Sequence, residues 1–83
     1  SPKTFAQLSK AERVEAAFQH AVIKYYADGG MTNTSLRERL GMHEKQRAQV
    51  SLIIKEALEQ NKIKPKDPHN VSTKFAEYVP FWA

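Results

Sequence analysis

The residues Met31–Asn61 read MTNTSLRERLGMHEKQRAQVSLIIKEALEQN, and this stretch decides the fold. It opens on four consecutive residues whose side-chain oxygen can cap the start of a helix: Thr32, Asn33, Thr34 and Ser35. Leu36 and Leu40 follow at the spacing of one helical face, and Gly41 can end the helix in the left-handed conformation without steric cost. The sequence therefore predicts a short helix that ends at a glycine turn.

A longer helix is predicted to follow, from about residue 44 to residue 60. Its bulky apolar residues all fall on one face, which is typical of a helix that packs on one side only: Val50, Ile53, Ile54, Ala57 and Leu58. A short helix, a glycine turn and a one-sided helix together favour a helix-turn-helix motif.

Another helix is predicted upstream, because Ser9 and Glu12 have the spacing of a capping box. Residues 1–8 show no periodicity and are expected to form a flexible lead-in. The pair Gly29-Gly30 ends this helix, and its apolar face holds Val14, Ala17, Phe18, Ala21, Val22 and Tyr25. A second, narrower strip holds Ala16, Ile23 and Tyr26. We expect the chain's own apolar tail, Tyr78–Trp82, to cover that strip, since a small domain must close its core with its own residues; the alternative is a dimer contact.

The residues after 60 predict a two-stranded hairpin. A first strand spans residues 61–66, where Pro65 indicates the edge of a sheet, and the turn sequence Asp67-Pro68-His69-Asn70 follows it. Residues 75–79 alternate well enough for a returning strand, and a brief further pairing is expected at Thr32. The predicted fold is therefore mainly α (α+β): a winged helix-turn-helix of three helices followed by a two-stranded β-hairpin wing.

Length and composition limit the classes of function that remain. The 83 residues suffice for one domain, predicted over residues 9–83, and the first residue, Ser1, suggests the C-terminal fragment of a longer protein. No apolar run approaches the roughly 18 residues of a membrane span, and the absence of cysteine excludes disulfides and thiolate metal sites. The three histidines His20, His43 and His69 have no ligand spacing. We expect a cytoplasmic domain without cofactor, metal or catalytic activity of its own.

The largest excess of positive charge lies in the C-terminal segment, residues 61–83. The net charge is +4, and residues 61–83 contain four lysines against Asp67 and Glu77, a balance of +2. Such a chain suits a polyanionic partner, although many small basic domains bind none.

Several short runs make the chain similar to a known family. They are His20-Ala21, Lys24-Tyr25, Met31-Thr32-Asn33, Ser35-Leu36-Arg37-Glu38-Arg39, Ile53-Ile54-Lys55, Ile63-Lys64-Pro65 and the distinctive end Tyr78-Val79-Pro80-Phe81-Trp82-Ala83. From about Ser9 onward the chain resembles the C-terminal domain of bacterial RecG-related, Schlafen/AlbA-type transcriptional regulators, often labelled ATP-dependent helicase-like. The resemblance implies a winged-helix module at the end of a larger DNA-binding protein. No Gly-Lys-Ser/Thr phosphate loop occurs in these residues, so any ATPase activity would lie outside them.

The first functional hypothesis is binding of double-stranded DNA, with the helix at 44–60 in the groove and the wing at 62–79 on the backbone. Base contacts are expected from the N-terminal half of that helix: Lys45, Gln46, Arg47 and Gln49. Phosphate contacts are expected at the short helix, from Thr32, Thr34, Ser35 and Arg37, and in the wing, from Lys64, Lys66, His69 and Lys74. The structural alternatives are solvated surface, plain helix caps and lysines that protect a sheet edge.

The second hypothesis is a protein-interaction or homodimerisation module. Members of the family that this chain resembles tend to carry a polar or basic residue where this chain has Leu52. By helical angle, Leu52 lies opposite the apolar stripe of its helix. Glu56 and Glu59 are expected near the same exposed face, and Ile23 adds an apolar residue on the first helix. The two hypotheses are compatible, because regulators often bind paired half-sites as dimers.

Overall fold

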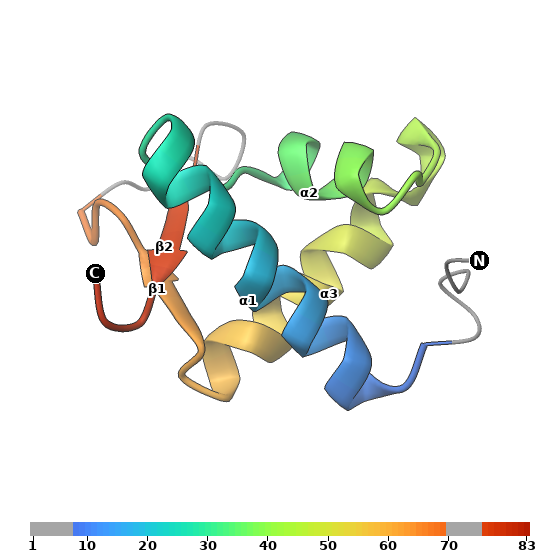
Figure 1. Ribbon diagram of the computed structural model, residues 1–83. Helices are drawn as coiled ribbons and strands as arrows, with labels where there is room; N and C mark the ends of the chain where they lie inside the picture. Colours follow the sequence, from blue (N-terminus) through green and yellow to red (C-terminus); the bar gives the residue numbers. More distant parts are fainter. Residues whose placement is uncertain (1–7, 70–75) are drawn as a thin grey trace.

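Three helices and a small sheet follow one another along the chain of the computed structural model, which describes residues 8–69 and 76–83 (Figure 1). Helix α1 spans Lys10–Ala27, α2 spans Asn33–Arg39, the 3-10 turn η2 spans Glu44–Gln46, and α3 spans Arg47–Glu59. Strands β1, Ile63–Pro65, and β2, Tyr78–Pro80, pair in antiparallel register. The predicted class is confirmed: a mainly helical domain ends in a two-stranded wing. Within the described ranges, no helix is long and apolar enough to cross a membrane.

Helix α1 begins where its capping box predicts. The Ser9 hydroxyl accepts a hydrogen bond from the Glu12 amide at 3.1 Å, and the Glu12 carboxylate accepts one from the Ser9 amide at 3.1 Å. These two bonds satisfy amide groups that a helix start leaves without intrahelical partners. The cap therefore fixes the first residue of the helix that packs against α3 and β2.

Helices α2 and α3 both end in a left-handed residue. Gly41 has φ +66°, and the Met42 amide donates to the Arg37 carbonyl at 3.0 Å. Asn61 has φ +57°, and the Lys62 amide donates to the Ala57 carbonyl at 3.0 Å. Both bonds belong to the helix-ending motif that turns the chain sharply. The second turn leads directly from α3 into β1.

The helix predicted from about residue 44 begins as a 3-10 turn and becomes α-helical only at Arg47. The His43 ring accepts a hydrogen bond from the Lys45 amide, and the Gln46 carboxamide accepts one from the His43 amide at 2.7 Å. These side-chain bonds hold the tighter turn, which delays the α-helix by one turn.

The core lies where the three helices meet, and β1 contributes Ile63 to it. Its fully buried members include Met31, Leu36, Val50 and Ile53, and Leu40, Met42, Leu58 and Tyr78 pack around it. The expected stripe of α3 is confirmed, except that Leu58 is only half-buried. The expectation for Glu56 was wrong. Its side chain is buried, because the Arg13 guanidinium reaches it from α1 across 3.2 Å.

The strands are shorter than predicted. β1 covers residues 63–65 rather than 61–66, because Asn61 and Lys62 form the turn that ends α3. β2 covers residues 78–80 rather than 75–79. Residues 67–69 of the predicted turn form a bend and a turn, whereas Asn70 and Phe75 lie outside the described residues. The further pairing expected at Thr32 is present one residue earlier: Met31 and Tyr78 exchange hydrogen bonds of 2.8 and 2.7 Å. Thr32 cannot take that place because it caps α2.

The C-terminal tail lies along α1, but covers less of it than expected. Phe81 stacks on Phe18 with ring centroids 6.0 Å apart, and Trp82 meets Tyr25 edge-on at 5.6 Å. Phe81 and Trp82 nevertheless remain about half exposed. Trp82 reaches Tyr26, but Ile23 is 54% exposed. The tail therefore touches the second strip only at Tyr26, which itself stays 74% exposed, and the prediction that the tail covers this strip was wrong.

Candidate nucleic-acid interface

The candidate interface is the exposed face of α3, the helix that immediately precedes the wing in the chain. Its centre holds Ala48, Leu52 and Lys55, which share one side of the helix at three- and four-residue spacing. Arg47 and Ser51 lie on the flank that faces α2. The buried side of the same helix anchors it to the core, so this face is held rigidly toward solvent.

Helix α2 is tied to that flank by Asn33. The Asn33 Nδ2 group donates to Ser51 Oγ at 2.9 Å and contacts the Arg47 carbonyl at 3.4 Å. This bridge fixes the angle between the start of α2 and the N-terminal half of α3. The two helices are thereby joined at the start of α2 and the N-terminal half of α3.

The four side chains predicted to read bases lie in η2 and the first turn of α3, but they differ in how freely they could meet a ligand. Lys45 and Arg47 are exposed, and Arg47 forms a long ion pair with Glu44 at 3.8 Å. Gln46 caps η2, and its Nε2 group donates to Gln49 Oε1 at 3.0 Å. Lys45 and Arg47 are therefore the better candidates for base contacts, since the two glutamine side chains already form a hydrogen bond with each other.

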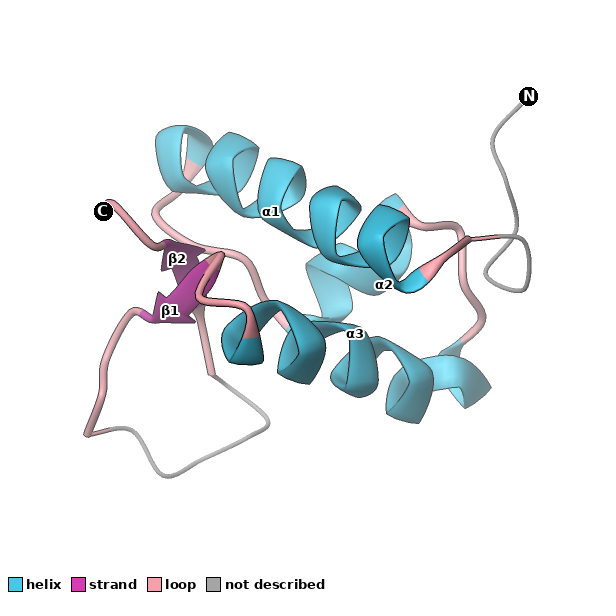
Figure 2. Ribbon diagram, turned by 90° about the horizontal axis from the view of Figure 1, so that it is seen from below, coloured by secondary structure: helices cyan, strands magenta, loops and turns pink. Residues whose placement is uncertain are grey.

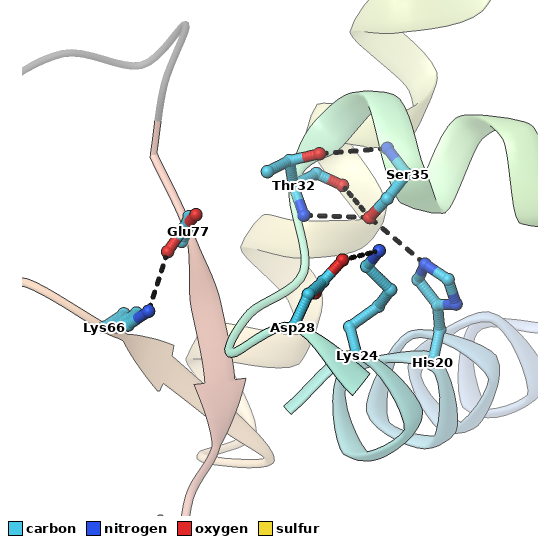
Figure 3. Close-up of polar contacts among 7 residues, drawn as sticks. All are labelled: His20, Lys24, Asp28, Thr32, Ser35, Lys66 and Glu77. Atoms are coloured by element: carbon cyan, nitrogen blue, oxygen red, sulfur yellow. Dashed lines mark hydrogen bonds and ion pairs between the residues drawn. The ribbon is translucent and has the colours of Figure 1, made fainter. Parts of the chain in front are cut away.

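The start of α2 is used mainly for capping (Figure 3). The Thr32 hydroxyl accepts from the Ser35 amide at 3.0 Å, and Ser35 Oγ accepts from the Thr32 amide at 2.9 Å. Ser35 Oγ also meets His20 Nε2 at 3.1 Å. Thr34 is exposed. Of the three hydroxyl residues predicted to hold phosphate, only Thr34 faces solvent freely enough to do so.

Arg37 lies half-buried on α2. Its Nη1 atom is buried and has no hydrogen-bond partner among the described residues. The residue is four positions after Asn33, on the side of α2 that meets α3. Arg37 therefore reaches the edge of the candidate interface with part of its guanidinium group withdrawn from solvent.

In the wing, the predicted lysines have different surroundings. Lys64 is exposed on β1, whereas Lys66 forms an ion pair with Glu77 at 3.2 Å (Figure 3). That pair packs on the turn after α1: a Cβ atom built on Gly29 would lie 2.9 Å from Lys66 Nζ. His69 is exposed, and its amide donates to the Asp67 carboxylate at 2.9 Å. Lys74 lies outside the described residues.

His20 lies buried between α1 and the start of α2. It is 7% exposed, and burial, followed by the nearby charges of Lys24 and Arg39, lowers its pKa below the usual 6.5. Burial therefore favours the neutral form of its imidazole, which contacts the Ser35 hydroxyl at the capping box of α2. On the same helix, a hydrogen bond from Lys24 lowers the pKa of the Asp28 carboxyl.

A half-open groove of about 400 Å³ runs between α1 and the end of α2. Its wall includes His20, Ile23, Arg39 and Leu40, and α3 contributes none of its lining residues. In the described part of the chain, no three His, Asp or Glu side chains are grouped so that they could hold a metal ion.

The residues predicted for protein interaction lie on different helices. Leu52 is 48% exposed on α3, and Ile23 is 54% exposed on α1. Because α1 and α3 lie side by side and pack through their buried faces, their exposed faces point away from each other (Figure 2). A single flat contact cannot include both residues.

Sequence reasoning missed three residues of this interface: Asn33 as the bridge, and Ser51 and Lys55 on the exposed face. The helical angle placed Leu52 on that face, and Lys55, three residues later, could have been placed there in the same way. The Asn33–Ser51 hydrogen bond could not have been predicted from the sequence, because it depends on how α2 and α3 cross.

Comparison of the chain with protein-family models, with curated protein sequences and with solved structures gave no match.

Proposed function

We propose that this domain binds double-stranded DNA, with the exposed face of α3 in the major groove and the wing beside the phosphate backbone. The observation that carries the proposal is the donor-rich, outward face of α3. Arg47, Ser51 and Lys55 stand there beside Lys45, and Asn33 holds the face against α2. An α-helix fits the major groove, and basic side chains at its N-terminal half meet base edges and phosphates.

Thr34, Arg37, Lys64 and His69 would support this docking from the periphery, where phosphate contacts set position rather than sequence preference. Lys66 would contribute less, because Glu77 already neutralises it. With the resemblance to bacterial RecG-related regulators, we infer a cytoplasmic transcriptional regulator whose other regions lie outside this chain. We assign the domain a binding role and no catalysis.

The test is fluorescence anisotropy with a labelled random-sequence duplex at low and moderate salt. We expect micromolar binding that weakens steeply as salt rises, because phosphate contacts release counterions. The double variant Lys45→Ala/Arg47→Ala should bind roughly tenfold more weakly. Its salt slope should be smaller by about 1 for each phosphate group that the domain no longer neutralises.

The matched control is Lys10→Ala/Arg39→Ala, which removes the same charge from exposed positions on α1 and α2, away from the α3 face. An equal loss of affinity in both double variants would mean that only net charge matters. Absence of binding by the unmodified domain at low salt would contradict the proposed function itself.

A second candidate, self-association, is favoured by the apolar surface of α1. Ile23, Tyr26 and Trp82 are 54%, 74% and 46% exposed, and the two aromatic rings lie 6.1 Å apart. Aromatic side chains of this kind are common anchors of protein interfaces. Because this surface points away from the α3 face, a homodimer could still bind DNA. Sedimentation velocity at tens of micromolar should show a dimer that Tyr26→Asp disrupts, and a monomeric unmodified domain would count against this candidate.

A further inference from the structure

Leu52 is a large apolar residue on the exposed face of α3. It is 48% exposed, although the adjacent Ile53 is completely buried. Ala48 lies one turn before it and Lys55 one turn after it, and both are exposed. An apolar side chain therefore stands at the centre of the surface that we propose to enter the groove.

The major groove offers one apolar group that such a side chain can recognise. The C5 methyl group of thymine projects there, beside the O4 acceptor of the same base. Leucine can cover this methyl group, and its burial is favourable to a degree set by the apolar area removed from water. Ala48, with only a methyl side chain, would let this turn of the helix approach the bases closely.

Polar neighbours of Leu52 match the rest of the thymine edge. The Ser51 oxygen accepts a hydrogen bond from Asn33 Nδ2 at 2.9 Å, which leaves its own proton to be donated. The Lys55 ammonium group is a donor only. The donors of Ser51 and Lys55 therefore lie on either side of the apolar Leu52. This arrangement complements the thymine edge, where the O4 acceptor lies next to the C5 methyl group.

We propose that Leu52 reads the C5 methyl group of thymine, so that the preferred duplex carries an A·T base pair facing the middle of α3. This inference rests on the proposed DNA-binding function and names the class of site it selects. Leu52 acts as the residue that distinguishes thymine by its methyl group, and the basic side chains of the same face supply the base and phosphate contacts of the proposed function.

The experiment compares two labelled duplexes of equal length, alternating d(A-T) and alternating d(A-U), which differ only in the C5 methyl groups. The unmodified domain should bind the thymine duplex about threefold to fourfold more tightly, as expected for the burial of one methyl-sized group. Leu52→Ala should bind both duplexes with the same affinity. Circular dichroism of that variant should be unchanged, because the residue is half exposed.

Lys55→Ala is the control, since it should weaken binding to both duplexes while the preference for thymine persists. Equal binding of the two duplexes by the unmodified domain would overturn the role of Leu52 and leave the proposed function standing. Discrimination that survives in Leu52→Ala would also overturn it, because the difference would then arise from duplex shape. Binding to neither duplex at low salt would refute the proposed function instead.

Discussion

Ile53→Ala is expected to lower the free energy of unfolding by about 3 kcal/mol, within the range for truncating a buried isoleucine. Ile53 is completely buried at the centre of the stripe through which α3 meets the core. Truncation removes apolar contacts and leaves a cavity that packed helices fill only in part. A domain of this size has roughly 4–12 kcal/mol of stability in all, so the variant should unfold at a markedly lower urea concentration.

The neighbouring substitution Leu52→Ala is a matched control for that measurement. It removes a side chain of similar size from the same helix, but from the exposed face. It should lower the free energy of unfolding by no more than about 0.5 kcal/mol, as most surface substitutions do. Equal losses at positions 52 and 53 in urea titrations followed by circular dichroism would contradict the assigned orientation of α3.

Local signals in the sequence were sufficient for the helices and their ends. The N-cap Ser9 and the left-handed Gly41 act through neighbours within a few positions, so their spacing alone identifies them. At the start of α2 the sequence gives four candidate caps, of which the structure uses Thr32. The buried stripe of α3 follows from helical periodicity in the same way. These predictions needed no knowledge of how the helices pack.

The candidate interface was predicted less completely because its details depend on contacts between distant residues. Lys66 is neutralised by Glu77 only once the strands pair, and Gln46 is occupied by a turn that the helical pattern does not reveal. Asn33 meets Ser51 across the crossing of two helices. Residue type and spacing therefore proposed the basic positions other than Lys55, while the fold decides which of those that the structure describes remain free to meet a ligand.

Glu56 shows the same limit, because its helical angle lies at the border between the exposed and buried sides of α3. Its partner is 43 residues away: Arg13 Nε and Nη2 reach the two carboxylate oxygens at 3.4 and 3.2 Å. Arg13 Nη1 also donates to the Leu8 carbonyl at 3.0 Å. This paired geometry joins the start of α1 to the second half of α3, and so helps to set the orientation of the helix that carries the candidate interface.

Glu56→Ala is accordingly expected to lower the free energy of unfolding by about 2–3 kcal/mol. The Glu56 and Arg13 side chains are 11% and 19% exposed, and removal of one member of a mostly buried ion pair leaves the other charge poorly compensated. Chemical denaturation measures the loss. Glu59→Ala, which removes an exposed carboxylate from the same helix, should change stability by no more than about 0.5 kcal/mol.

The double substitution Arg13→Met/Glu56→Leu separates the ion pair from the packing that surrounds it. Replacing both charges by apolar side chains of similar volume is often neutral or stabilising, so the double variant should recover most of the stability that Glu56→Ala removes. If Glu56→Ala were no more harmful than Glu59→Ala, the pair would contribute nothing to the docking of α1 on α3. A loss that the double variant fails to recover would show instead that the carboxylate itself, rather than charge compensation, is required at this position.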